Sequence, residues 1–387
     1  MEKEQEGDRK DNMTKLLSLV WYKVLPARFG GQKGIAEFNR YLSVHFPLTC
    51  LCSSDNTPAG NEPYELRPEL PIGRSQVLNP FAWRKIVVTA KKGAYTHLIL
   101  EHPYYGLIAI WLKKRHGIFL ISHSHNIEFQ RFREMNRWWW PILRWLEGKV
   151  HRNADLNLYK TENDLHEAIR IFGSDPKRCM VLPYGLTREK TPDESERHAA
   201  RERIGRQHGI PDETTILYFN GTLDYFPNAK ALRWMVKEML PLLNTMLKKP
   251  FRLLVTGRNI KPGFRDLEEL RHDTFIYAGL VEDVADYYLA SDIFLSPVNQ
   301  GGGIKVKVLE ALSWGLTVVC SPHSAEGIDI RMAGSKLHIG NDDVNNFCKK
   351  IVEALTDPGS IPERFFDYYH WSNLLKPVVE RISASQD

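Results

Sequence analysis

Residues 292–322 read DIFLSPVNQGGGIKVKVLEALSWGLTVVCSP, and their pattern indicates the fold class. A short apolar run, DIFLSP, leads into three consecutive glycines, after which apolar residues recur at helical spacing from Ile304 to Leu312. A second apolar run, LTVVCSP, follows at once. A strand, a helix and another strand in this order form a parallel crossover unit, so the segment predicts part of a doubly wound α/β sheet.

The same alternation extends through the rest of the chain. It includes the strands TTILYFNG, FRLLVTG and TFIYAG on one side of the polar stretch 187–213, and KLLSLVWYKVLP, THLILEH, GIFLISHSHN and ADLNLYKT on the other, with a helix near 80–92. We predict two Rossmann-like domains facing a central cleft, because ligands bind at the carboxyl ends of such strands. The predicted parts are an N-terminal domain at 14–186, a linker at 187–213, a C-terminal domain at 214–360 and a C-terminal helix at 361–387 that crosses back.

Length and composition exclude several classes of protein. The 387 residues suit two domains of ordinary size, and a net charge of +5 is too mild to indicate nucleic-acid binding. The charged opening MEKEQEGDRKDN has no apolar run, and no later window has eighteen uninterrupted apolar residues. We therefore expect a cytoplasmic protein without a secretory signal or a membrane span.

The glycine segment has the features of an anion site. Its glycines allow close approach of the backbone to a ligand, and a helix that starts near Gly303 presents unpaired N–H groups. Lys305 and Lys307 lie near that start, where the helix dipole disfavours a cation unless an anion is present. The alternative is that both lysines are solvated on the polar face. Neither the Walker pattern nor the dinucleotide pattern is present.

Glu310 is the second unusual residue of this segment. It lies between Leu309 and Ala311, about two turns inside the predicted helix, among residues that should pack. A carboxylate in that position needs partners, and the vicinal hydroxyls of a ribose are suitable ones. Together with the lysines, it predicts a site for a nucleotide diphosphate.

Several stretches in a fixed order carry a family resemblance. They are RFGG, SHNIEF at 124–129, FNGTLDYFPNAKAL at 219–232, VTGRN, YAGLVEDVADYYLASDIFLSP, GGGIKVKVLEALSWGLTVV and AEGID. With them, the chain resembles glycosyltransferase family 4, which has the GT-B architecture, over nearly all of its length after residue 14. In the E-x7-E pattern of that family, the second glutamate falls on Glu310 and the first on Gly302. The basic residues usual after Gly221 are also missing, which resembles a branch with G-G-G-x-K-x-K in place of the first glutamate.

The resemblance implies a retaining glycosyltransferase. Such an enzyme moves a hexose from a UDP- or GDP-sugar to a glycan or lipid-linked acceptor in cell-surface polysaccharide or glycoconjugate synthesis. It implies no metal and no further cofactor, because backbone N–H groups and lysines stabilise the charge that develops on the diphosphate. We infer that diphosphate neutralisation has moved to Lys305 and Lys307, assisted by Arg258.

The resemblance also assigns site residues. His125 corresponds to the pocket histidine near the reacting centre, and Glu310 to the ribose ligand. A purely structural histidine, a surface Arg258 and a simple tight turn at Gly30 remain the alternatives, and Glu128 either orients His125 or caps the next helix. The implied donor-binding residues are Gly30, Gly31, Gly221, Thr222, Arg258, Gly279, Leu280, Gly302, Gly303 and Ile304.

Residues 131–152 carry several tryptophans and an excess of arginine. This composition is favoured at membrane surfaces, so we predict peripheral contact with the inner face of the membrane. The alternative is a helix with ordinary buried aromatic residues. Two other functions also remain open: a nucleotide-sugar 2-epimerase of the same fold, and an inactive protein that binds nucleotide sugar.

Overall fold

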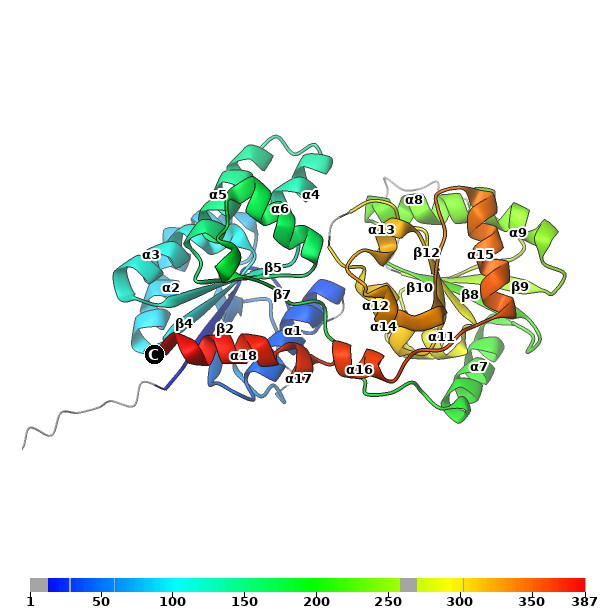
Figure 1. Ribbon diagram of the computed structural model, residues 1–387, viewed down its shortest axis with the longest axis horizontal. Helices are drawn as coiled ribbons and strands as arrows, with labels where there is room; N and C mark the ends of the chain where they lie inside the picture. Colours follow the sequence, from blue (N-terminus) through cyan, green and yellow to red (C-terminus); the bar gives the residue numbers. More distant parts are fainter. Residues whose placement is uncertain (1–12, 28, 59, 258–269, 302, 387) are drawn as a thin grey trace, which may run out of the picture. The chain divides into compact units, whose positions relative to one another are not determined.

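A computed structural model describes residues 13–27, 29–58, 60–257, 270–301 and 303–386 (Figure 1). The predictions made for Arg258 and Gly302 lie outside these residues. The chain divides into two compact units. Unit 1 contains the residues up to Leu182 and those from Leu374 onward, and unit 2 contains Pro183–Asn373. Each unit holds one parallel sheet flanked by helices.

Unit 1 is built on a seven-stranded parallel sheet with the order β3-β2-β1-β4-β5-β6-β7. Its strands are β1 (Leu16–Val20), β2 (Leu48–Ser53), β3 (Glu65–Leu70), β4 (His97–Glu101), β5 (Phe119–Ser124), β6 (Leu156–Tyr159) and β7 (Cys179–Val181). Its main helices are α1 (Gly30–Leu42), α2 (Pro80–Lys92), α3 (Gly106–His116), α4 (Glu128–Glu134), α5 (Trp140–Asn153), α6 (Glu162–Phe172) and α18 (Lys376–Ser383).

The register of the central strands aligns their carboxyl ends. All residues of β1 and β4 are buried, as expected for parallel strands with helices on both faces. Val20 of β1 pairs with Glu101 of β4, and Glu101 pairs with His123 of β5. Side chains at the ends of these strands, and those that follow them, therefore lie at one edge of the sheet.

Two helices of unit 1 have side-chain caps at their starts, and one of them, α2, is the helix predicted near 80–92. The Asn79 side chain accepts a hydrogen bond from the Phe81 N–H, and Pro80 occupies the first turn of α2. The Thr161 hydroxyl accepts from the Asp164 N–H at the start of α6. These caps satisfy N–H groups that lack partners within the helix and so stabilise the helix starts.

Unit 2 contains a six-stranded parallel sheet with the order β10-β9-β8-β11-β12-β13. Its strands are β8 (Thr215–Asn220), β9 (Phe251–Thr256), β10 (Phe275–Gly279), β11 (Ile293–Ser296), β12 (Thr317–Cys320) and β13 (Leu337–Ile339). Helices that matter below are α7 (Glu194–His208), α8 (Phe226–Trp234), α11 (Ala285–Ala290), α12 (Val306–Ser313), α13 (Pro322–Ala325), α15 (Val344–Thr356) and α16 (Arg364–Tyr369).

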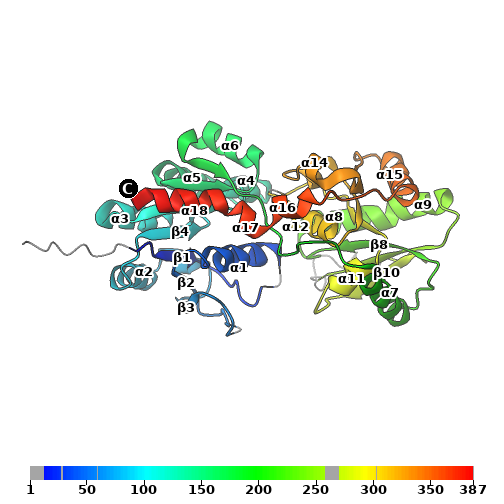
Figure 2. The same ribbon diagram turned by 60° about the horizontal axis from the view of Figure 1, so that its bottom comes forward.

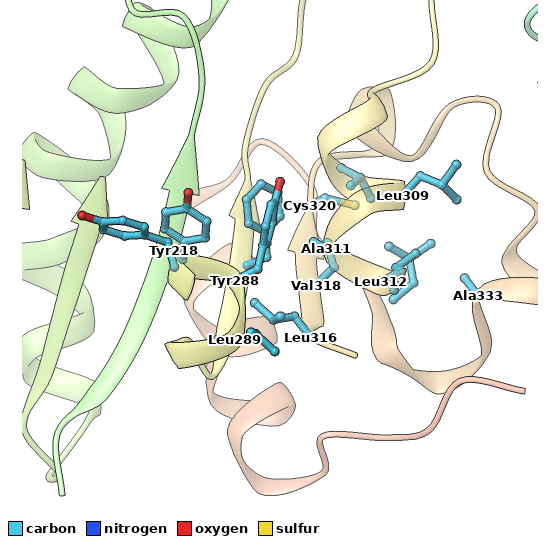
Figure 3. Packing of buried hydrophobic residues seen from close by; sticks show 14 of the residues in the cluster. Tyr218, Tyr288, Leu289, Leu309, Ala311, Leu312, Leu316, Val318, Cys320 and Ala333 are labelled. Atoms are coloured by element: carbon cyan, nitrogen blue, oxygen red, sulfur yellow. The ribbon is translucent and has the colours of Figure 1, made fainter. Parts of the chain in front are cut away.

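The quoted stretch folds as β11, a glycine loop, α12 and β12. Leu309 and Leu312 of α12 belong to the same buried cluster as Val318 of β12 and Tyr218 of β8 (Figure 3). Burying each leucine contributes about 1.5–3 kcal/mol, so the apolar face of α12 fixes the helix against the sheet. Lys305, Lys307 and Glu310 are thereby held in position by packing.

The predicted linker at 187–213 is wrong for much of its length. Residues 194–208 form α7, capped by Asp193, and its Ala200 and Ile204 are buried in the core of unit 2. The helix has few apolar residues and many charges, so its periodicity was too weak to detect from sequence.

The predicted domain boundaries at 186 and 361 also need correction. Leu186 forms a β-bridge with His370, and the Trp371 ring lies against Gly185, so both segments belong to unit 2. The chain rejoins unit 1 at Leu374. There the Arg381 guanidinium in α18 donates to the Lys177 carbonyl at 2.7 Å, and α18 is the red helix of Figure 2.

Candidate active site

The carboxyl edge of the unit 1 sheet carries a group of buried titratable side chains. Glu101 is the last residue of β4, His123 lies near the end of β5, and Lys160 directly follows β6. His125, the predicted pocket histidine, lies one residue beyond β5. Glu101 and His123 have fully buried side chains, whereas the His125 side chain is 13% exposed.

Three hydrogen-bonding contacts join these four side chains into one chain. The Lys160 Nζ lies 2.7 Å from Nε2 of His123, and His123 Nδ1 lies 2.9 Å from Oε1 of Glu101. The other carboxylate oxygen, Oε2, lies 2.7 Å from Nε2 of His125. One carboxylate therefore connects two imidazoles.

The surroundings determine the charges in this chain. Burial lowers the pKa of His123 and of His125 to about 4, although Glu101 opposes the shift. Burial alone would raise the pKa of Glu101, but His123 and His125 hold it well below its usual range. Burial also lowers the pKa of Lys160 to about 8, against the attraction of Glu101. Near neutral pH the group therefore contains an anionic carboxylate, two neutral imidazoles and an ammonium.

Further aromatic side chains pack around His125. The His102 ring stacks on it at 4.6 Å between centroids, and Tyr22 packs edge-on against His102 at 5.5 Å. His102 has φ of 68°, which costs energy in a residue other than glycine, and such strain is common at functional sites. A Cβ built on Gly31 would lie 3.7 Å from the Tyr22 hydroxyl. Gly31, in the first turn of α1, is thus close to Tyr22, which packs against His102.

Glu128 has neither of the roles considered from sequence. It is the first residue of α4, and its carboxylate accepts from the Tyr104 hydroxyl at 2.7 Å. The α4 N–H groups of Glu128 and Phe129 donate instead to Glu147, at 2.8 and 2.9 Å. Glu147 caps the helix, and among the described residues there is no hydrogen bond between Glu128 and His125.

A metal ion is a conceivable occupant of the histidine group. Glu101, His123 and His125 each offer a ligand atom, all within 4.8 Å of one another. In this structure those atoms are in hydrogen-bonding contact with one another, and Lys160 lies against the second ring nitrogen of His123. The ammonium already balances the carboxylate, and it would repel a cation. We therefore describe the group as a hydrogen-bonded network.

At the carboxyl edge of unit 2, three glycines pack together. Gly221 follows β8, Gly257 follows β9 and Gly279 ends β10. The Gly257 N–H donates to the Gly279 carbonyl at 2.8 Å, and a Cβ on Gly257 would lie 2.1 Å from the Gly221 carbonyl oxygen. Of these, Gly257 was not predicted. The neighbouring Leu280 is 60% exposed, and the Thr222 carbonyl accepts from the Tyr225 N–H at 3.1 Å.

In the glycine loop before α12, backbone carbonyls are in hydrogen-bonding contact with nearby side chains. Gly301 and Gly303 have φ of 93° and 73°, values that favour glycine. The Gly301 carbonyl accepts from the Lys305 ammonium at 2.5 Å and lies 2.7 Å from Nε2 of His323. Lys305 also donates to the Gly303 carbonyl, at 3.0 Å. Ile304 packs against the core of unit 2. The helix itself starts at Val306, later than the predicted start near Gly303.

Lys307 reaches the end of strand β8. Its ammonium donates to the Asn220 carbonyl at 3.2 Å and to the Asn228 side chain at 3.1 Å, and lies 4.4 Å from the centroid of the Phe219 ring. Burial, assisted by the charge of Lys305, lowers the Lys307 pKa to about 7. A cation thus lies beside Gly221, where the usual basic residues are missing.

Glu310 lies about one turn inside α12 and is half-buried. Burial and the charge of Glu310 raise the pKa of Tyr288. The Tyr288 hydroxyl accepts from the Asn220 side chain at 2.7 Å. Asn220 therefore contacts both Tyr288, beside Glu310, and Lys307, which places the predicted ribose and phosphate ligands around the end of β8.

A cavity of unit 2 lies away from these strand ends. It measures about 860 Å³ and is lined by Thr215, Ile293 and Thr317, which are the first residues of β8, β11 and β12. Ligands of doubly wound sheets bind at the opposite, carboxyl ends of the strands. This cavity is therefore separate from the predicted donor site.

Comparison with known families assigns both halves of the chain. Residues 30–190 match the family described as Glycosyltransferase Family 4, and residues 214–357 match Glycosyl transferases group 1. The chain belongs to the family 4 glycosyltransferases. Among curated relatives of this glycosyltransferase, the D-inositol 3-phosphate glycosyltransferase of Gordonia bronchialis is 24% identical over 293 residues. The match covers 71% of this chain and 61% of the relative, so the chain spans about three fifths of that protein's length.

Solved structures confirm the GT-B fold of this glycosyltransferase. Anabaena HepE, in complex with UDP and glucose, superposes with a TM-score of 0.72 at 14% identity, over 96% of this chain and all of HepE. A sucrose-phosphate synthase from Thermosynechococcus elongatus gives a TM-score of 0.69 at 16% identity, covering 96% of this chain and 94% of the synthase. Identities this low show the fold alone.

Several residues of the candidate site were not predicted from the sequence. Gly30, Gly31 and His125 lie in unit 1, and the other described candidates lie in unit 2. A usable signal was present, because THLILEH and ADLNLYKT both end in polar residues after a buried run. Such residues face the ligand edge of a parallel sheet. The missed residues are Glu101, His102, His123, Lys160, Asn220, Asn228 and His323.

Proposed function

We propose that this protein is a retaining hexosyltransferase that uses a UDP- or GDP-hexose. The observation that carries the proposal is the position of Lys307, whose ammonium contacts the last residue of β8 beside Gly221. Backbone turns and a half-buried cation at strand ends suit a diphosphate, because both stabilise negative charge. Glu310, which lies near Tyr288, would bind the ribose hydroxyls.

UDP-glucose is the first donor to test. HepE, which has the same fold, was solved with UDP and glucose. We expect backbone groups near Gly279 and Leu280 to bind the nucleobase of the donor. Side chains then do not determine whether the base is uracil or guanine.

The proposed chemistry needs positioning more than a protein base. In a retaining transfer at one face of the sugar, the leaving phosphate helps to deprotonate the acceptor hydroxyl. The protein then has to orient both substrates and stabilise the diphosphate charge. Lys305 and Lys307 would supply that stabilisation, and His125 would contact the transferred sugar. We therefore propose that turnover requires no divalent metal.

The acceptor proposed is a glycan or a lipid-linked sugar at a membrane surface. None of the helices in the described parts of the chain is long and apolar enough to span a bilayer. The α4–α5 region nevertheless exposes Trp138, Ile142 and Trp145 to solvent, at 82%, 60% and 51%. Exposed arginines lie among them, a combination that binds anionic lipid.

Calorimetric titration with UDP-glucose and GDP-hexoses tests the donor proposal. Lys307→Ala should weaken UDP-glucose binding about 10- to 100-fold, because a hydrogen bond to a charged group contributes about 1.5–3 kcal/mol. Lys237→Ala is the matched control, since Lys237 is exposed on another helical segment of unit 2. Lys305→Ala should also weaken binding, and chelator should leave donor turnover unchanged.

Three outcomes would contradict parts of this proposal. Wild-type affinity in both lysine variants would remove the lysines from the donor site. Failure to bind any UDP- or GDP-hexose would remove the donor itself. Conversion of the donor to an epimer without an acceptor would indicate the isomerase instead.

A further inference from the structure

His125 is held by residues from three different strand ends. Glu101 comes from β4, His123 from β5 and Lys160 from the residue after β6. Glu101, His123 and Lys160 are each at most 3% exposed, so water does not compete for their hydrogen bonds. A structural histidine needs only one hydrogen-bonding partner. Here the chain of contacts extends beyond Glu101 and His123 to the ammonium of Lys160, which is 37 positions from His123 in the sequence.

The donor and acceptor capacities along the chain fix the protons. An ammonium can only donate, so Lys160 donates to Nε2 of His123, and the proton of neutral His123 is on Nδ1. That proton is donated to Oε1 of the ionised Glu101. Oε2 is likewise an acceptor, so His125 must donate from Nε2. The remaining ring nitrogen, Nδ1 of His125, then carries a lone pair.

We propose that Lys160, His123 and Glu101 are positioning residues that hold His125 as a neutral imidazole with its proton on Nε2. Nδ1 then accepts a hydrogen bond from a sugar hydroxyl, an assignment that rests on the proposed glycosyl transfer. Within the described part of the chain, no protein group is hydrogen-bonded to Nδ1 of His125. His102, stacked at 4.6 Å, restrains the ring plane, so the lone pair has a fixed direction.

Lys160 has a second effect, through its charge. The ammonium is close enough to disfavour protonation of both His123 and His125. It therefore adds to the effect of burial, which is the main cause of the low pKa of His125, and opposes the attraction of Glu101 for an imidazolium. The other titratable groups around His125 are His102, Tyr22, Glu128 and Arg131. The proposed proton positions do not involve the titration of these four groups.

Nitrogen-15 NMR of histidine-labelled full-length protein tests the proton positions without any substrate. At pH 7 we expect a protonated Nε2 and an unprotonated Nδ1 for His125, and the reverse for His123. Signals are assigned with His123→Asn and His102→Asn. A proton on Nδ1 of His125, or an imidazolium at this pH, would overturn the proposal. So would a stoichiometric metal bound by these side chains in the purified protein.

Kinetics separate positioning from a merely structural role. In Lys160→Met the acidic limb of the donor kcat/KM profile should move up by about one pH unit, because a nearby positive charge is lost. Glu101→Gln should lower kcat about 10- to 100-fold, because its amide must donate to one imidazole and so reverses a tautomer. Lys160→Arg should restore the pH profile, and Lys114→Met, on the exposed end of α3, should leave it unchanged.

Separate results would contradict the proposed glycosyl transfer and the proposed role of Lys160. If the wild-type protein transfers no sugar but shows the expected tautomers, the proposed function is wrong and the proton arrangement holds. If transfer occurs and Lys160→Met changes neither the tautomers nor the pH profile, Lys160 is not a positioning residue.

Discussion

At the scale of single residues, Lys307 links donor binding to pH. Its pKa is lowered to about 7, so much of it is neutral at pH 8 in the free protein. A bound diphosphate would favour the ammonium and raise that pKa. UDP-glucose binding above pH 7 should therefore take up a proton.

Calorimetry in buffers with different ionisation enthalpies measures this uptake. We expect a proton uptake that grows from pH 6 to pH 8 and an affinity that falls about tenfold for each pH unit well above 7. In Lys307→Met the uptake should disappear. An uptake that is identical in wild type and Lys307→Met would show that another group titrates.

The glycine at the end of β9 provides a second test at this scale. A Cβ on Gly257 would lie 2.1 Å from the Gly221 carbonyl oxygen, a backbone atom that cannot rotate away. Gly257→Ala should therefore lower the free energy of unfolding by about 1–3 kcal/mol and weaken UDP-glucose binding. Gly31→Ala is the control, because its Cβ would make an ordinary contact at 3.7 Å. Urea unfolding that gives equal stabilities for both variants would contradict the packing argument.

At the scale of secondary structure elements, the tryptophans of α5 and of the residues just before it have two roles. Trp139 and Trp140 pack against the core of unit 1, whereas Trp138 and Trp145 are exposed. Replacing Trp138, Ile142 and Trp145 with alanine should abolish sedimentation with anionic liposomes without reducing stability, because only exposed apolar surface is removed. The control is Trp139→Ala, which should destabilise the protein. Undiminished lipid binding by the triple variant would exclude this surface.

The elements themselves were predictable where local signals were strong. The alternation of apolar runs gave most strands, and the helix predicted near 80–92 is α2. The strands β2, β3 and β13 were missed, and α7 was taken as a linker. In α7 only a few residues, among them Ala200 and Ile204, are buried, so tertiary packing rather than periodicity determines that helix.

At the scale of the whole molecule, buried neutral histidines make unit 1 sensitive to acid. Burial lowers the pKa of His97, His102, His123 and His125 to about 4, compared with 6.5 when unfolded. Between these values the unfolded chain binds more protons, so stability falls as the pH falls from about 6.5 to 4. At pH 4.5 each of these buried histidines should lower the free energy of unfolding by about 2 kcal/mol relative to neutral pH.

Amide hydrogen exchange of β4 and β5 peptides, corrected for intrinsic rates, follows this loss. Protection should fall steadily from pH 6.5 to pH 4.5, and His97→Asn should reduce the slope. Constant protection over this range would contradict the assignment of buried neutral histidines.

The candidate site was predictable only in part, because the arrangement of the whole sheet decides which side chains meet. His125, Lys307 and Glu310 could be located because each follows a recognisable strand or lies in a distinctive segment. Their partners could not, since the pairing of Glu101 with both histidines depends on strand order and register. Two residues 24 positions apart become neighbours only when parallel strands align.

The discontinuity of unit 1 has a consequence for biosynthesis. Helix α18 and the residues after it pack with the N-terminal strands, and the Ser385 hydroxyl lies 2.8 Å from Nε2 of His97. All of unit 2 is translated between these two parts. Unit 1 therefore cannot complete its packing during synthesis until the whole of unit 2 and then α18 have been translated.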